Sequence, residues 1–273
     1  MQIREKMKLF QENPVHSWHE HVWFRSNEEQ VLNERHLERQ MEVFDLFGFD
    51  RIVVSLPILH MKRCPAELFQ KANAVVYEAM KRYPGKVYGM AYVHPGHLTE
   101  ALAQIDHCVQ DLGMVGVKLY RDYRMDDPIQ NPIIEKCIDL DVPILMHAMR
   151  NMDRNSILMH PLTSTGVHIA NAAKRYPEAV FQLGHFTITD WEYQLKAIAP
   201  YENIYTDMSG SAYDRPQMEQ AVQMLGANRI LFGTDESIVS SVGKILGARI
   251  SEEDKKTILA GGAFAKYMER AGG

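Results

Sequence analysis

The segments VPILMH (residues 142–147) and VFQLGH (residues 180–185) decide the fold of this chain. Each is a short apolar run that ends in a histidine, a pattern typical of a buried strand with a polar residue at its end. Between them, residues 163–176 have the apolar spacing of an amphipathic helix. Strand, helix and strand in this order predict a parallel βαβ unit with a right-handed crossover.

The same alternation extends in both directions along the chain. Strands are expected at residues 15–23, 51–57, 86–93, 114–120, 142–148, 179–185, 202–208 and 229–235. Helices are expected at residues 28–47, 66–83, 97–112, 128–140, 163–176, 189–199, 215–225 and 251–270. Eight such units in about 250 residues predict an α/β fold closed into a (β/α)8 TIM barrel, as a single domain over residues 1–273. The alternative is an open doubly wound sheet, but its phosphate-binding G-x-G-x-x-G segment is missing.

The composition excludes several classes of protein. The 273 residues carry 30 basic and 35 acidic side chains, so the chain lacks the basic excess that binding to nucleic acid requires. No apolar run approaches the ~18 residues of a transmembrane helix, and the first residues do not resemble a signal peptide. Three cysteines argue against a disulfide framework and for a reducing compartment. We therefore expect a cytoplasmic globular protein whose partners are neither nucleic acids nor membranes.

Chemistry-bearing side chains occur where the expected strands end. His19 and His21 end the first strand, His147 the fifth, His185 the sixth and Asp235 the eighth. A single histidine at a strand end is more often structural, and in a chain with twelve histidines the H-x-H pair alone is weak evidence. Closure of a barrel, however, brings all five residues to one mouth. Several imidazoles and one carboxylate in a small volume suit a divalent metal ion such as Zn²⁺.

Several motifs together resemble a known family. They are WHEH (residues 18–21), GVKL (116–119), PILMH (143–147), LGH (183–185), GANRILFGTD (226–235) and GGAF (261–264). Their order and spacing resemble the amidohydrolase superfamily, specifically its amidohydrolase-related (family 2) branch of TIM-barrel metal-dependent hydrolases. The resemblance spans nearly the whole chain, and it implies the same barrel.

The resemblance implies a role for each strand-end residue. His19, His21 and His147 match metal ligands of the family. Asp235 matches the aspartate that contacts the metal and its water. His185 matches a histidine that either binds a second metal or acts on the substrate.

The number of metal ions depends on Lys118, which matches a lysine that is carboxylated in two-metal members and unmodified in many one-metal members. We expect one ion, which is Zn²⁺ with Mn²⁺ as the alternative. In the two-metal case, Lys118 and His185 would bind the second ion.

Ser17 departs from the family, which usually has aspartate at that position.

The expected activity is hydrolysis of an amide, ester or lactone bond in a small substrate. Metal-bound water would be the nucleophile, Asp235 the general base and then acid, and His185 the partner of the substrate oxygen. The first alternative is a one-metal lyase of the same superfamily, either a decarboxylase or a hydratase. The second alternative, from another class, is an inactive barrel that serves as a binding protein.

The substrate is expected to be anionic. Arg150 and His160 lie on the long loop after the fifth strand and are the candidate substrate-binding residues. An arginine there suits a carboxylate or phosphate, although it could equally be a solvated surface charge. The family resemblance also implies a homo-oligomer.

Overall fold

The structure is a computed structural model, and it describes residues 3–58, 64–149, 161–188, 190–212, 214 and 216–271. Arg150 and His160 lie outside these residues, so their role as substrate contacts stays a prediction. No described helix has both the length and the apolar character needed to cross a bilayer.

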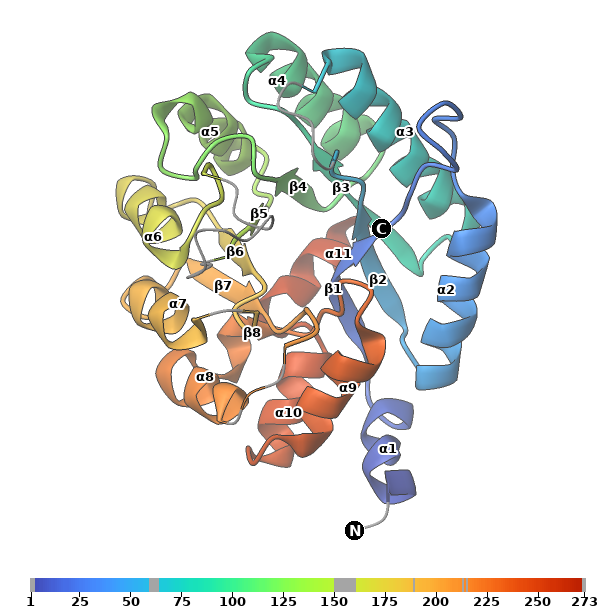
Figure 1. Cartoon of the computed structure of the whole chain (residues 1–273), viewed down its shortest axis with the longest axis vertical. Helices are drawn as coiled ribbons and strands as arrows, with labels where there is room; N and C mark the ends of the chain where they lie inside the picture. The colour runs from blue at the N-terminus through green and yellow to red at the C-terminus, as the bar shows by residue number, and fades with distance from the viewer. Residues whose placement is uncertain are drawn as a thin grey trace.

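Eight parallel strands follow one another around the molecule in chain order (Figure 1). They are β1 (His16–His21), β2 (Arg51–Ser55), β3 (Val87–Tyr92), β4 (Gly116–Leu119), β5 (Ile144–His147), β6 (Phe181–Gly184), β7 (Ile204–Asp207) and β8 (Ile230–Leu231). Backbone hydrogen bonds join the last strand to the first: Trp18 N donates to Phe232 O at 2.8 Å, and Asp235 N donates to His19 O at 2.8 Å. The predicted (β/α)8 barrel is therefore confirmed.

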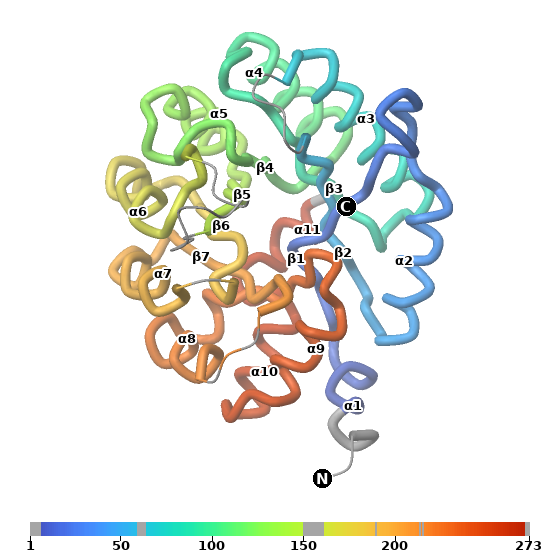
Figure 2. The backbone as a smooth tube through the Cα atoms, viewed as in Figure 1, coloured from blue at the N-terminus to red at the C-terminus, as the bar shows by residue number. Residues whose placement is uncertain are grey.

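Helices surround the strands (Figures 1 and 2). The described α-helices are α1 (Ile3–Gln11), α2 (Glu34–Phe47), α3 (Ala66–Arg82), α4 (Leu98–Asp106), α5 (Asn131–Asp139), α6 (Gly166–Arg175), α7 (Trp191–Ile198), α8 (Gln217–Leu225), α9 (Ile238–Gly247), α10 (Glu252–Leu259) and α11 (Ala265–Ala271). A π-helical turn (His107–Asp111) continues α4, and short 3₁₀ turns occur at Pro128–Gln130, Ala227–Arg229 and Gly262–Phe264.

Two helices, α1 and α9, lie outside the expected set. The sequence of α9, IVSSVGKILG, is rich in residues of modest helix propensity, so its local signal is weak. Its helix is stabilised by burial of Val242, Ile245 and Leu246 against the barrel. The helix expected to start at residue 28 instead starts at Glu34, because the side chain of Asn33 accepts a hydrogen bond from His36 N and caps it there.

The expected helix 251–270 is split in two. Gly261 and Gly262 both adopt positive φ values, 86° and 50°, which end α10 and redirect the chain. After this break, Phe264, Tyr267 and Met268 join a buried cluster with Trp18 of β1 and with inward residues of the other strands, among them Val53, Tyr88, Met90, Val115, Leu145 and Leu231. Figure 2 shows α11 behind the ring of strands. This segment therefore closes the end of the barrel that lies opposite the carboxyl ends of the strands.

An irregularity in β1 positions its histidines. The pairing of β1 with β2 shifts register between Ser17 and Glu20. Trp18 and His19 are consecutive, yet Trp18 packs in the inner cluster and His19 contacts Lys118 and Asp207 across the barrel. A bulge of this kind re-aims side chains by breaking the usual alternation of faces. It brings His19 into the interior together with Trp18.

Candidate metal centre and active site

The barrel brings His19, His21 and Asp235 together, as expected. One donor atom of each lies within 4.8 Å of the others. A second group with the same spacing contains His19, His185 and Asp207. The two groups share His19, so they form one buried cluster at the carboxyl ends of β1, β6, β7 and β8.

His19 is completely buried and is held by a carboxylate. Its Nδ1 lies 2.9 Å from Asp207 Oδ2, so the proton resides on Nδ1 and the lone pair on Nε2. Lys118 Nζ lies 2.9 Å from Nε2. A metal ion and the Lys118 ammonium would need the same lone pair, so they cannot share it.

His21 is oriented in the same sense. Its Nδ1 lies 3.2 Å from the backbone oxygen of Ser55, which fixes the proton on Nδ1. Its Nε2 is 2.9 Å from Asp235 Oδ1. Both histidines of the H-x-H pair thus present Nε2 to the interior, with their rings 5.3 Å apart.

His147 and His185 form a further pair. His147 Nδ1 lies 3.1 Å from His185 Nε2, and His185 Nδ1 lies 2.8 Å from Ser209 Oγ. Since Ser209 Oγ donates its one proton to Asp207 Oδ1, it accepts from His185 Nδ1. His185 Nε2 is then an acceptor for His147 Nδ1–H, and the lone pair of His147 is on Nε2. This Nε2 is buried and has no hydrogen-bond partner among the described residues.

Burial keeps these imidazoles neutral. It lowers the pKa of His185 to about 3 and the pKa of His147 well below the ordinary value. It also lowers the pKa of His19, with a further contribution from Lys118. Neutral imidazoles are the form that ligates a metal.

The two carboxylates remain ionised, although Asp207 is completely buried and Asp235 is half-buried. Burial alone would raise the pKa of Asp235, but the nearby side chains of His185, His21 and His19 hold it below the ordinary value. Burial likewise acts to raise the pKa of Asp207, and His19 and Ser209 outweigh it. For Lys118, burial lowers the pKa to about 8.

This donor set fits a divalent metal ion. His21 offers an oriented Nε2, His19 offers another once the Lys118 ammonium moves off it, and Asp235 offers an ionised carboxylate. His147 adds a buried lone pair that has no partner among the described residues. Histidine nitrogens mixed with one carboxylate suit Zn²⁺ or Mn²⁺. An unsatisfied buried nitrogen is costly, and a bound ion would satisfy the lone pair of His147.

Asp207, Ser209 and Glu20 are functional candidates that sequence reasoning did not assign. Asp207 ends strand β7 and Ser209 follows it, so their position at a strand end was the available signal. What the sequence does not reveal is which histidine each one contacts. Asp207 accepts bonds from His19 and from Gln182, whose Nε2 is 2.9 Å away.

Glu20 holds the loop that carries Asp235. Its carboxylate accepts bonds from Thr234 N at 3.1 Å, from Thr234 Oγ1 at 2.8 Å and from Ser17 Oγ. Asp235 adopts a positive φ of 46°, a conformation that is uncommon for residues other than glycine. Ser17, where the family usually has aspartate, therefore supports Glu20 and through it the position of Asp235.

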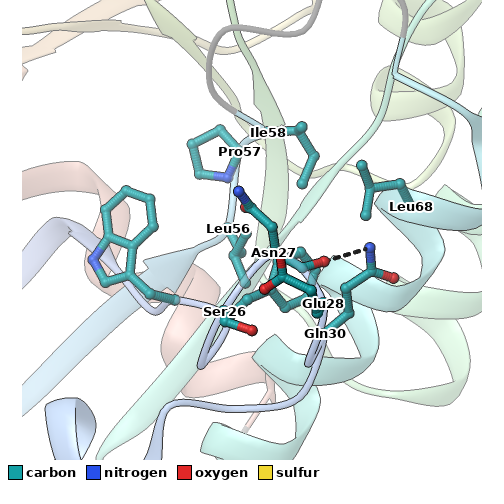
Figure 3. A pocket seen from close by; sticks show the side chains of 10 residues that line it. Ser26, Asn27, Glu28, Gln30, Leu56, Pro57, Ile58 and Leu68 are labelled. Atoms are coloured by element: carbon teal, nitrogen blue, oxygen red, sulfur yellow. Dashed lines mark hydrogen bonds between the residues drawn. The ribbon is translucent and has the colours of Figure 1, made fainter.

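A cavity of about 940 Å³ is lined by residues that follow β1 and β2 and by Leu68 of α3 (Figure 3). Its walls are largely apolar and are formed by Trp23, Phe24, Leu56, Pro57, Ile58 and Leu68, with Ser26, Asn27, Glu28 and Gln30 as polar lining. Trp23 connects the two sites, because its ring lies 5.5 Å from the ring of His21. The cavity is large enough for a small aromatic or aliphatic molecule.

Replacing Asp207 with asparagine is expected to weaken metal binding about 10- to 100-fold. The amide cannot accept from His19, Gln182 and Ser209 as the carboxylate does, so the Nδ1–H tautomer of His19 loses its support. The dissociation constant for Zn²⁺ is measured by isothermal titration calorimetry. An unchanged dissociation constant would show that Asp207 does not orient His19.

The fold and the cluster together define a TIM barrel with a candidate metal centre at its mouth. The sequence profile of the amidohydrolase family (Amidohydro_2) matches residues 15–261. The chain therefore belongs to the amidohydrolase family.

The individual relatives share low sequence identity with this chain. The chain is 26% identical over 280 residues to a γ-resorcylate decarboxylase from a Polaromonas species, an alignment that covers 83% of this chain and 85% of the relative. A 2,6-dihydroxybenzoate decarboxylase from Rhizobium is 20% identical, with a TM-score of 0.73 over 96% of this chain and 100% of the other. A 5-carboxyvanillate decarboxylase from Novosphingobium aromaticivorans, solved with manganese, is 18% identical, with a TM-score of 0.74 over 95% and 97%. The two structural likenesses show the shared fold.

Proposed function

We propose that this protein is a metal-dependent lyase that removes CO₂ from a small carboxylated, hydroxylated aromatic substrate. The observation that carries the proposal is the 26% identity to a γ-resorcylate decarboxylase over 83% of this chain and 85% of that relative. The comparisons thus favour the lyase alternative over the hydrolase expected first from the sequence.

One divalent ion, Mn²⁺ or Zn²⁺, is proposed to bind to His19, His21, His147 and Asp235. When bound, it supplies positive charge that holds and polarises the oxygens of an anionic substrate. The partners of Nδ1 orient the three histidines in advance: Asp207 for His19, the Ser55 carbonyl for His21 and His185 for His147. This pre-organisation reduces the cost of assembling the site.

The surroundings of the cluster suit a carboxylate. Tyr120 packs its ring 4.6 Å from that of His147, and Arg121 Nη2 donates to Tyr120 Oη at 2.7 Å. Lys118 adds a second cation inside the barrel. The Lys118 and Arg121 cations favour an anion, and the apolar cavity beside Trp23 suits the substrate ring.

The chemistry requires one proton. In decarboxylation the bond between the ring carbon and the carboxyl carbon breaks, CO₂ leaves, and the electron pair on the ring carbon takes up a proton. His185 and Asp235 are placed to handle this proton, since His185 Nδ1 lies 3.6 Å from Asp235 Oδ2. An anionic substrate beside His185 would raise the pKa of this imidazole from its low value, and Asp235 acts in the same direction.

Hydrolysis remains the second candidate because Asp235 is ionised. A carboxylate with a low pKa beside a metal ligand can accept the proton of an attacking water. The inactive-barrel alternative has less support, since His19, His21 and Asp235 lie close enough together to hold a metal ion.

A substrate panel separates the two reactions. The metal-loaded protein is incubated with 2,6-dihydroxybenzoate and other hydroxybenzoates, and separately with aryl esters and lactones. We expect CO₂ release from a hydroxybenzoate and no acid release from the esters or lactones. Acid release from the esters or lactones without any CO₂ would establish hydrolysis instead.

A further inference from the structure

Lys244 of α9 is a buried lysine that contacts two of the loops behind the candidate site. Only 2% of the residue is exposed. Its Nζ lies 2.8 Å from Thr187 Oγ1, 2.9 Å from Met208 O and 2.6 Å from Gly210 O. These are three acceptors for the three protons of an ammonium group.

The acceptors belong to different loops. Thr187 lies in the loop after β6, whereas Met208 and Gly210 lie in the loop after β7. Thr187 Oγ1 also donates to Ser209 O at 2.7 Å, so the hydroxyl and the ammonium join the loops from one point. A buried ammonium interacts strongly with carbonyl dipoles because water does not compete.

The loop that Lys244 holds carries the partner of His185. Ser209 lies between Met208 and Gly210, and its Oγ accepts the proton of His185 Nδ1 at 2.8 Å. His185 itself adopts a positive φ of 65°, so its conformation depends on its surroundings. A displaced Ser209 would leave this imidazole without the hydrogen bond that sets its tautomer.

We propose that Lys244 is a positioning residue for His185: its ammonium fastens the loops after β6 and β7 so that Ser209 holds the His185 imidazole. The inference rests on the proposed function, in which His185 handles the proton. Lys244 itself touches neither the proposed ligands nor the substrate cavity in the described contacts.

The test measures His185 directly. In zinc-loaded protein with ¹⁵N-labelled histidine, the Nδ1 proton of His185 is assigned by comparison with His185→Asn. We expect Lys244→Met to accelerate exchange of this proton with water at least about tenfold, with zinc content unchanged. The matched control is Lys255→Met, which removes a largely buried lysine that pairs with Glu252 on α10; it should leave the exchange rate unchanged.

A rescue experiment separates charge from packing. Lys244→Ala lacks the three carbons and the nitrogen that propylammonium supplies, so propylammonium should restore slow exchange, whereas 1-propanol should not. If Lys244→Met does not fold, Lys244→Ala prepared in propylammonium and then dialysed provides the same comparison. Unchanged exchange in the variants, or equal rescue by propanol, would overturn the proposal. Neither readout uses a substrate, so the result stands even if no CO₂ release is found.

Discussion

Replacing His185 with asparagine is expected to lower kcat for CO₂ release about 10²- to 10⁴-fold, the usual contribution of a positioned proton-transfer group. His185 is 2% exposed, is held by Ser209 and lies 3.6 Å from Asp235. Asparagine is the appropriate replacement because it accepts the positive φ at this position more readily than most residues. The measurement is kcat together with metal content.

His185 lies beside the proposed metal ligands and is not one of them. We therefore expect His185→Asn to bind as much metal as the wild type does. The control is His168→Asn, which alters a histidine that caps α6 through Thr165. That variant should keep full kcat if it remains folded. Full kcat in His185→Asn would remove His185 from the mechanism, and loss of metal would instead make it a ligand.

Replacing His147 with alanine is expected to weaken metal binding more than about 100-fold and to abolish activity. The Nε2 of His147 is buried and has no hydrogen-bond partner in the described part of the chain, and a bound ion would satisfy its lone pair. Loss of a ligand should exceed the 10- to 100-fold effect typical of the groups that support ligands. Because a bound ion stabilises only the folded state, the rise in Tm on adding Zn²⁺ should also disappear.

The control for this variant is His107→Ala, since His107 is an exposed helical residue paired with Asp111. It should bind metal as the wild type does. Normal metal affinity in His147→Ala would exclude His147 from the ligand set. A normal Tm in the absence of metal, measured in parallel, verifies that the variant folds.

The sequence predicted the barrel because the alternation of strands and helices is a local pattern that survives in every unit. It also predicted that His19, His21 and Asp235 would meet, since strand ends of a closed barrel share one mouth. The predictions from the sequence were wrong for elements that lack a strong local pattern. Helix α9 depends on burial, and the break before α11 depends on the close approach of Gly261 to Trp18.

The supporting residues of the site could not be predicted in the same way. Asp207 contacts His19 across 188 positions of sequence, and Lys244 reaches Thr187 from another helix. Such contacts depend on the register of the strands and on the irregularity in β1, which no local pattern encodes. The sequence therefore identified the candidate ligands but not the groups that set their tautomers.

The most direct test of the central claim is to titrate metal-free protein with Mn²⁺ or Zn²⁺ and to measure the release of labelled CO₂. The substrate is carboxyl-labelled 2,6-dihydroxybenzoate, or the best substrate of the hydroxybenzoate panel. We expect no release without metal, and a rate that rises with bound ion and reaches its maximum at one ion per chain. Equal CO₂ release by fully metal-free protein, or no CO₂ from any hydroxybenzoate at full metal loading, would contradict a metal-dependent decarboxylase.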